Sequence, residues 1–349
     1  MKTKKSSTQF RRLIGALGVL AIATMSLTAC GGETAPSSAP PPPPPSASES
    51  ATPTESAWVP VDLHISFTYS SPLLPPFVAG KEGIFQKHGL NVTMEAQTNT
   101  ATATSSLGKQ FDMVMQTPSG FLSALSEGIS IIAVSNVALN TAKEPNTYVM
   151  VANDSPYQEL KDLVGKRVGV VNVTSASTIA MQYVAMQQGI GKDDFDFVAT
   201  PFANMEDQIK AGNIDAAVSV IPYSRVIELA GHRSISEPVT EASQIAINSD
   251  RSTNAFFIAD KDWALANGEV ITRFRAAIDE AIAWIAANSE TAMTHCAEMT
   301  GLDIAVVRDT PLPEFSGELL EADLMTMIVA NEAVGITQGR QSLEGAILP

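Results

Sequence analysis

The sequence predicts an α/β protein with two lobes, each built on a doubly wound and mainly parallel sheet. Strand-like and helix-like segments alternate from Val61 onwards, and a chain of 349 residues is long enough for two such lobes. A pattern of glycine, acid, apolar strand and proline occurs twice, at 108–118 and at 212–222. In both halves an apolar strand also runs into hydroxyl side chains and then a helix, at 63–71 and at 168–177. These repeats indicate that the two lobes are similar.

The first half opens with a strand, a helix and a second strand, an order that predicts a βαβ unit with two parallel strands. The elements expected there are a strand at 63–69, a helix at 72–81, a strand ending near 96, a helix ending at 104–108, a strand at 112–115, a helix at 120–126 and a strand at 129–134.

The second half begins with a strand at 147–152 and continues into the stretch 162–191. The β-branched run from Val168 to Val173 is typical of a strand buried on both faces of a parallel sheet. Apolar residues from Ile179 to Met186 follow at helical spacing, and Gly189 is placed to end that helix in a left-handed conformation. Further elements are expected as a helix ending at 209–212, strands at 215–220, 243–248 and 254–259, and helices at 223–230, 263–266, 269–288, 289–300 and 317–334.

Hydroxyl side chains between the predicted strand and helix, at 174–178, mark the stretch where we expect a ligand. A helix start leaves backbone N–H groups unpaired and carries a partial positive charge, so the hydroxyls either cap the helix or help to hold an anion. Doubly wound sheets bind ligands outside the carboxyl ends of their strands, so four such loops would converge on one cleft. The candidate ligand-binding residues are Tyr69, Ser70, Ser71, Leu73, Gln116, Thr117, Ser119, Asn136, Thr174, Ser175, Ser177, Thr178 and Tyr223.

The candidate side chains are all uncharged, and this limits the chemical class of the ligand. A buried cation would need carboxylates, so amines and metal ions are disfavoured. A small oxyanion fits a helix start rich in hydroxyls, and a neutral polar or aromatic ligand with tyrosine walls is the alternative. Arg225 is the nearest cation in the sequence; it either stays solvated or turns inward to pair with a sulfonate or carboxylate.

The overall charge excludes other classes of partner. The first 29 residues hold five of the 22 basic residues and none of the 37 acidic ones, which leaves the rest of the chain with a formal net charge of −20. Such a surface repels nucleic-acid phosphates and anionic lipid headgroups. We therefore expect no nucleic-acid partner.

The N-terminal segment is typical of an exported protein. A basic start and a short apolar run are followed by Leu-Thr-Ala-Cys-Gly-Gly at 27–32, which resembles a bacterial lipoprotein signal over 1–29, with Cys30 as the site of lipid attachment; an ordinary secretory signal is the alternative. Residues 30–60 are rich in proline and serine and predict an extended tether, or alternatively a docking motif. Cys296 lies in a helical pattern, so we expect a buried structural thiol.

Sequence motifs of enzymes are missing. The chain has no dinucleotide, P-loop, serine-hydrolase or zinc-protease signature, and its histidines at 64, 88, 232 and 295 lack metal-ligand spacing. Asp112 and Asp215 occur at equivalent positions of the two halves, where we expect them to fix loops. We therefore expect no enzyme activity, cofactor or metal.

Three segments, 77–92, 160–169 and 212–217, resemble the periplasmic-type substrate-binding proteins of ABC importers. They are most similar to the branch that takes sulfonates, nitrate, taurine and pyrimidine precursors of thiamine. The resemblance implies the type II fold with a hinge of two chain crossings, near 151–153 and near 248–254. Lobe 1 would comprise 61–152 and 251–349, the latter with the C-terminal helices, and lobe 2 would comprise 153–250.

The resemblance also implies a function. The protein would be a lipid-anchored monomer on the extracytoplasmic face of the cell membrane, delivering a small organic anion of the sulfonate, nitrate or aromatic carboxylate class to the transmembrane permease subunits and their ATPase. Two alternatives stay open, a receptor for a neutral heteroaromatic such as a thiamine pyrimidine precursor, and a biosynthetic enzyme of the same fold.

Overall fold

The computed structural model describes residues 58–97 and 100–349. The described residues all lie within one compact unit. The expected signal segment, Cys30 and nearly all of the tether lie outside the described residues. Within the part of the chain that is described, no helix is both long enough and apolar enough to cross a membrane.

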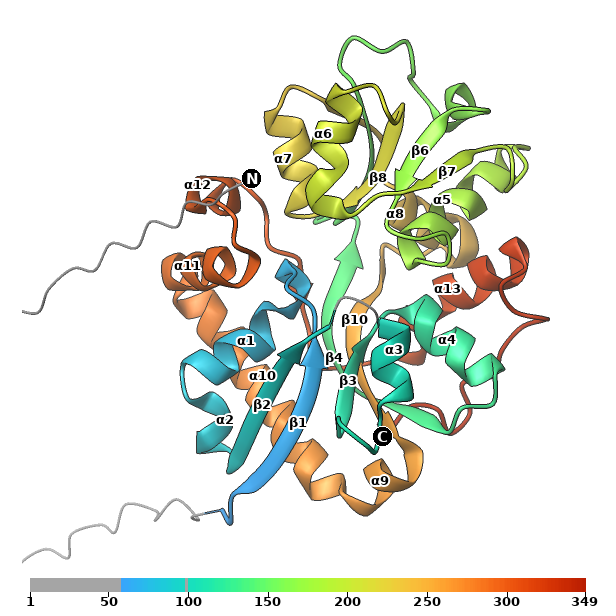
Figure 1. The fold of residues 1–349 in the computed structure, drawn as a ribbon. Coiled ribbons are helices and arrows are strands. Elements are labelled where there is room, and N and C mark those ends of the chain that lie inside the picture. The colour runs from blue at the N-terminus through green and yellow to red at the C-terminus, as the bar shows by residue number, and fades with distance from the viewer. Residues whose placement is uncertain (1–57, 98–99) are drawn as a thin grey trace, which may run out of the picture. The chain divides into compact units, whose positions relative to one another are not determined.

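The strands form two sheets, as the sequence predicts, but both sheets are mixed rather than mainly parallel (Figure 1). The six-stranded sheet has the order β11-β4-β10-β3-β1-β2 and the five-stranded sheet has the order β7-β6-β8-β5-β9. Parallel pairs join β1 to β2 and β3, and join β6 to β7 and β8, whereas β10 and β5 pair antiparallel with their neighbours. The strands are β1 Val61–Phe67, β2 Leu90–Ala96, β3 Met113–Gln116, β4 Ile131–Thr141, β5 Thr147–Val151, β6 Arg167–Val170, β7 Asp196–Ala199, β8 Ala216–Val220, β9 Arg233–Ser236, β10 Arg251–Asp260 and β11 Glu314–Phe315.

Helices cover both faces of the six-stranded sheet, with α1, α2 and α10 on one side and α3 and α4 on the other (Figure 1). The helices are α1 Leu74–Lys81, α2 Ile84–Lys87, α3 Thr100–Ser105, α4 Pro118–Ser126, α5 Ala176–Gln187, α6 Met205–Lys210, α7 Tyr223–Leu229, α8 Pro238–Ile247, α9 Lys261–Ala266, α10 Gly268–Ala287, α11 Ser289–Thr300, α12 Ile304–Arg308 and α13 Glu321–Val334; short 3-10 turns occupy Ser71–Leu73, Leu160–Leu163 and Phe202–Asn204.

The two strands β4 and β10 connect the sheets. They pair antiparallel from Arg251 opposite Thr141 to Asp260 opposite Ile131. The chain leaves the six-stranded sheet after β4 and returns to it at β10. Because the end of β4 pairs with the start of β10, the two crossings lie side by side. The second crossing falls within the expected range 248–254. The first crossing was expected near 151–153, but it lies at 142–146, because β5 already belongs to the five-stranded sheet.

Three other details differ from the sequence-based expectation. Residues 243–248, expected as a strand, lie mostly in α8, which begins at a proline and packs its buried face on α5 and α13. Strand β6 ends at Val170, and beyond it Val171 and Val173 are exposed. The strands β7, β9 and β11 were not expected, because they are short and none of them is a continuous buried apolar run of the kind that marks an internal strand.

Asp112 and Asp215 fix equivalent strand starts in the two sheets. The Asp112 carboxylate accepts a hydrogen bond from the His64 backbone N–H at 2.8 Å, and the Asp112 N–H donates to the His64 carbonyl at 2.9 Å. Asp215 makes the same pair of contacts with the backbone of Arg167, at 3.0 and 2.7 Å. The repeated acids therefore set the register between parallel neighbours, as expected of structural residues.

Helix α13 packs against elements of both sheets. It contacts α5 and α8, which pack with the five-stranded sheet, and also α4 and β10. One hydrophobic cluster consequently contains residues of both sheets, including Val114 and Phe256 of one and Val168 and Val218 of the other. Cys296 belongs to the second cluster, is 1% exposed, and burial raises the pKa of its thiol to about 12.

The Arg251–Asp323 ion pair fastens α13 to the start of β10. Asp323 is 3% exposed, and its carboxylate accepts two hydrogen bonds from the Arg251 guanidinium, at 2.8 and 2.5 Å. Hydrogen bonding to this carboxylate raises the pKa of Arg251 above its usual value. Because the pair is bidentate and mostly buried, removal of one partner leaves an uncompensated charge.

We predict that Asp323→Ala lowers the free energy of unfolding by about 2–3 kcal/mol, because Arg251 loses its buried partner while remaining partly hydrated. Urea unfolding followed by circular dichroism measures the change. The matched control is Glu290→Ala, which removes the exposed Arg308–Glu290 pair and should cost less than about 1 kcal/mol. Equal effects of the two substitutions would contradict a structural role for the Asp323 pair.

Candidate functional site

The loops that follow β1, β3, β6 and β8 meet in two pairs. The Ser71 hydroxyl, after β1, donates a long hydrogen bond of 3.5 Å to the Ile221 carbonyl, after β8. The Ser119 hydroxyl, after β3, donates one of 3.4 Å to the Thr174 carbonyl, after β6. Each pair joins one sheet to the other. The structure thus brings together, in two pairs, the four loops in which the sequence places the ligand.

The hydroxyl groups at the start of α5 are bonded mainly to one another. Ser175 is the N-cap residue, and its hydroxyl accepts a hydrogen bond from the Thr178 N–H at 3.3 Å. It also lies 3.0 Å from the Ser177 hydroxyl and 2.9 Å from the Thr178 hydroxyl, which donates to the Asn172 carbonyl. Thr174, which is exposed, bonds through its hydroxyl to the Asn172 side chain. Capping therefore explains the arrangement of this cluster.

Three candidates lie inside the six-stranded lobe. Asn136 is fully buried, and its amide donates to the Ser316 carbonyl at 2.9 Å and accepts from the Thr253 hydroxyl. Gln116 donates to the Thr104 hydroxyl at 2.9 Å and accepts from the Thr117 N–H at 2.8 Å. Leu73 is 1% exposed and belongs to the hydrophobic core. These contacts favour structural roles for all three residues.

Two tyrosines give the loops aromatic surface. Tyr69 is 54% exposed and packs edge-on against Phe67, with the ring centroids 5.2 Å apart. Tyr223, which begins α7, stacks on Phe202 at 5.9 Å, and burial raises the pKa of its hydroxyl. Ser70 and Thr117 are half-buried beside these loops. Flat apolar faces of this kind suit a small aromatic or polar solute.

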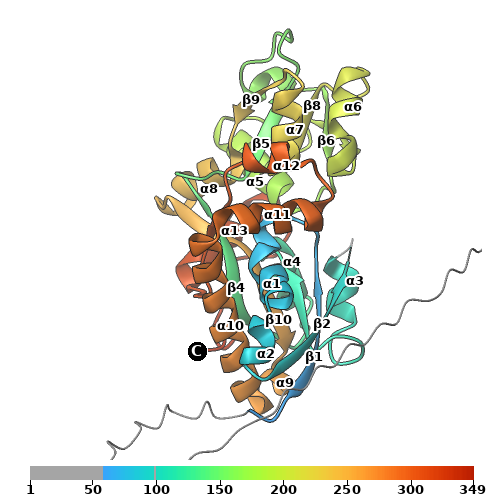
Figure 2. The ribbon, with the colours of Figure 1, turned by 90° about the vertical axis from the view of Figure 1, so that its left-hand side faces the viewer.

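Arg225 is engaged by carboxylates rather than free. Its guanidinium donates to Asp309 at 2.9 Å and to Glu228 at 2.6 Å, and Asp309 follows α12 on the other side of the boundary between the sheets. Hydrogen bonds, first to Asp309 and then to Glu228, raise the pKa of Arg225 above its usual value. Figure 2 shows α12 next to α7 and β5. Sequence reasoning did not find Asp309, because it lies 84 residues from Arg225 outside any recognisable motif.

A cavity of about 370 Å³ adjoins this ion pair. Its lining comes from β5, the β8–α7 junction, α7 and β9, together with the segment after α12. The lining residues are Tyr148, Met150, Ile221, Ser224, Arg225, Glu228, Ser234, Asp309, Thr310 and Pro311. Because Ile221 also meets Ser71, the cavity borders one of the two places where the loops touch.

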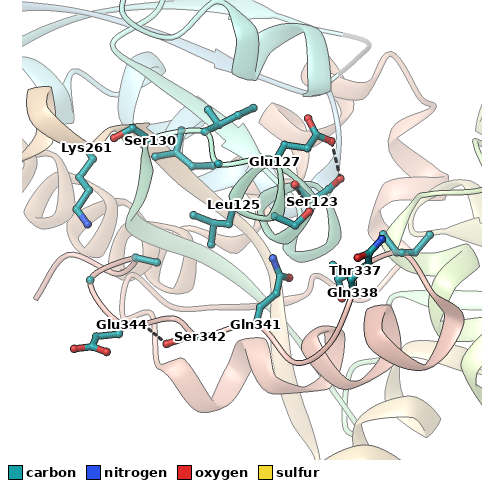
Figure 3. Close-up of a pocket in the computed structure, with 17 residues that line it drawn as sticks. Ser123, Leu125, Glu127, Ser130, Lys261, Thr337, Gln338, Gln341, Ser342 and Glu344 are labelled. Carbon is teal, nitrogen blue, oxygen red and sulfur yellow. Dashed lines mark hydrogen bonds between the residues drawn. The ribbon is translucent and has the colours of Figure 1, made fainter.

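A larger hollow of about 930 Å³ lies elsewhere, between the end of α4, the start of β4 and the C-terminal segment (Figure 3). Its lining includes Lys261, Glu127, Gln341 and Glu344, and Ser123 bonds to Glu127 at 3.3 Å. None of the sequence-predicted site residues lines it. Its location, away from the carboxyl ends of the sheets, makes it the poorer candidate for the main site.

Histidine, cysteine and acidic side chains are the groups that a metal site or a catalytic step would use. Over 58–97 and 100–349, no group of three or more His, Cys, Asp or Glu side chains is placed to hold a metal ion. The Nε2 atom of His295 bonds to Glu82 at 2.7 Å, and the ring stacks on Trp284. Cys296 is buried with a raised pKa, which opposes formation of a nucleophilic thiolate.

Two sheets joined by paired crossings, with loops facing each other, define the two-lobed type II fold of periplasmic binding proteins. The chain belongs to the NMT1/THI5-like family, whose model matches residues 71–292. A protein of Brucella abortus (strain 2308), provisionally named a binding protein, is 25% identical over 233 residues, which cover 65% of this chain and 68% of that protein.

Solved structures share the fold. The periplasmic aliphatic sulphonate binding protein SsuA of Escherichia coli matches with a TM-score of 0.69 and 18% identity, over 82% of this chain and 97% of that one. The alkanesulfonate-binding SsuA of Xanthomonas axonopodis pv. citri, bound to MOPS, matches with a TM-score of 0.69 and 17% identity, over 84% and 99%. The nitrate-binding NrtA of Synechocystis PCC 6803 matches with 0.58 and 14%, over 76% and 75%. The expected fold and family are therefore confirmed.

We predict that Ser175→Ala lowers the free energy of unfolding by about 1 kcal/mol without any ligand, because α5 loses its N-cap. Chemical denaturation of the ligand-free protein measures this. Thr174→Val is the control, since it removes an exposed hydroxyl and should change the free energy by less than about 0.5 kcal/mol. An unchanged stability of Ser175→Ala would contradict the capping role.

Proposed function

We propose that this protein is the extracytoplasmic solute-binding component of an ABC importer. The solute would lie among the loops after β1, β3, β6 and β8, and closure of the lobes over it would create the form that the permease recognises. The observation that carries this proposal is the pairing of Ser71 with Ile221 and of Ser119 with Thr174. Family membership and the sulfonate- and nitrate-binding proteins of the same fold support it.

The geometry supports a neutral polar or heteroaromatic solute best, such as a thiamine pyrimidine precursor. The hydroxyls at the start of α5 already hydrogen-bond to one another, and Arg225 already donates hydrogen bonds to two carboxylates. These groups are therefore engaged within the protein and less available to an anion. Tyr69 and Tyr223 offer aromatic faces instead. A small organic anion of the sulfonate, nitrate or aromatic carboxylate class is the second candidate, favoured by what the fold neighbours bind.

We propose further that the protein is attached to the membrane through a lipid on Cys30 and acts as a monomer. Residues 1–32 support the lipid attachment, because a basic start and an apolar run are followed by small residues around Cys30. The proline-rich composition of residues 30–60 also supports it, since an extended tether would hold the folded unit away from the membrane. The partners would be the transmembrane subunits of the permease and their ATPase.

A ligand panel tests the solute-binding role. At 100 times its dissociation constant, a ligand that binds only the folded state adds about 2.7 kcal/mol to stability, so thermal unfolding should shift upward for members of one class only. The panel contains pyrimidines, alkanesulfonates, nitrate and aromatic carboxylates. No shift with any member would contradict the proposal, and turnover of a bound member into product would revive the enzyme alternative.

The lipid anchor is tested separately in cells. We predict that Cys30→Ser moves the protein from the membrane fraction to the soluble fraction, because the thiol that carries the lipid is lost. Immunoblotting of fractionated cells measures the shift. Cys296→Ser is the matched control and should stay in the membrane fraction. Membrane association that survives Cys30→Ser would rule out lipid attachment at this residue.

A further inference from the structure

An ion pair crosses the boundary between the two lobes beside α7. The Arg225 guanidinium donates through Nε to Asp309 at 2.9 Å, and its Nη2 atom bonds to the same carboxylate oxygen. Arg225 belongs to the first turn of α7, whereas Asp309 directly follows α12, and Figure 2 shows these two helices next to each other. The pair therefore connects two helices that belong to different lobes.

Each partner of the pair is fixed to its own lobe. Helix α7 packs on β5, β8 and β9 of the five-stranded sheet. Helix α12 packs on α11, which packs on α1 and α10 of the six-stranded lobe. The Asp309 N–H donates to the Ala305 carbonyl at 3.2 Å, so Asp309 is held to the end of α12. If the lobes move apart on this side, the Arg225–Asp309 pair has to break.

A second carboxylate holds Arg225 within its own lobe. Glu228 lies three residues further along α7 and accepts a hydrogen bond from Nη1 of Arg225 at 2.6 Å. When the lobes separate, Arg225 therefore keeps Glu228 as a partner, and Asp309, whose side chain is 53% exposed, is released to water. Because separation leaves no charge buried and unpaired, this contact can form and break at a small cost in free energy.

The packing beside the ion pair is incomplete. The 370 Å³ cavity adjoins it, with Met150 and Ile221 of one lobe and Pro311 of the other in its lining. The nearby loop contact between Ser71 and Ile221 is a neutral hydrogen bond of 3.5 Å, which is long for such a bond. Electrostatic attraction therefore contributes more to the contact between the lobes here than it does at α13, where an apolar cluster joins them.

We propose that Arg225, Asp309 and Glu228 form a reversible ionic latch that sets the balance between open and closed lobes. Arg225 attracts Asp309 and so favours the closed form. Glu228 opposes closure, because it competes for the guanidinium and also repels the Asp309 carboxylate across the boundary. This assignment rests on the movement of the lobes that the proposed function requires, but it concerns the ligand-free protein and needs no particular solute.

Single-molecule fluorescence energy transfer on the ligand-free full chain tests the latch. One dye is attached to α6 through Lys210→Cys and the other to α11 through Thr294→Cys, which are exposed positions on the two lobes, in a Cys30→Ser background. Cys296 is 1% exposed and should not react with the dyes. The measured quantity is the ratio of closed to open molecules.

The latch predicts shifts of opposite sign for two neighbouring carboxylates. Asp309→Asn should lower the closed-to-open ratio about two- to fivefold, the range that one solvated ion pair supports. Arg225→Gln should lower it further, because Glu228 and Asp309 then face each other without a cation. Glu228→Gln should raise it, since Arg225 is then left to Asp309. All three shifts should shrink in about 1 M salt, where the Debye length is about 3 Å.

Arg308→Gln is the matched control. It removes the same charge one residue away from Asp309, but its partner Glu290 lies in the same lobe, so the ratio should stay at the wild-type value. Equal ratios in all variants, a fall with Glu228→Gln, or a matching change in Arg308→Gln would overturn the latch.

The latch and the solute-binding role can fail independently. A failed latch leaves solute binding in place, since the ligand panel tests that role separately. A panel without any shift defeats the solute role, whereas the closed-to-open ratios are measured without solute and still decide the latch. Unfolding midpoints of the variants, expected within about 3 °C of the wild type, separate altered opening from lost folding.

Discussion

The antiparallel pairing of β4 with β10 is the constraint on which the arrangement of the lobes depends. The chain enters the second sheet from the end of β4 and returns at the start of β10, and Thr141 pairs with Arg251 at that point. Polar contacts, a buried one between Asn136 and Thr253 and a partly buried one between Asn140 and Asn254, fix the register near the crossings. Because both connections start from adjacent residues of one ladder, the loops of the two sheets are held facing each other.

The packing on the two sides of these crossings differs in kind. On one side α13 lies against helices of both lobes and shares a hydrophobic cluster with them. On the other side the bridge is the Arg225–Asp309 pair, whose side chains are 24% and 53% exposed. Apolar packing resists separation more than a solvated ion pair does. Separation of the two sheets should therefore be easier on the α7–α12 side, where the smaller cavity lies.

The sequence predicted the fold well because its signals are local and repeated. The strand-to-hydroxyl junctions at Ser71 and Ser175, and the paired acids Asp112 and Asp215, identify two similar lobes without any knowledge of their contacts. Contacts between distant residues left no such signal. Asn136, a candidate ligand-binding residue, bonds to Ser316 and Thr253, which lie far from it in the sequence. The Arg225–Asp309 ion pair and the contacts of α13 with both lobes also could not be predicted, because they arise only from tertiary packing.

We place the solute between the loops after β1, β3, β6 and β8. The decisive measurement is a crystal structure of the protein with its tightest-binding solute. We expect solute density within hydrogen-bonding distance of residues from both lobes, beside Tyr69 and Tyr223. Density confined to the 930 Å³ hollow beside Lys261 and Gln341, or contacting one lobe only, would contradict it.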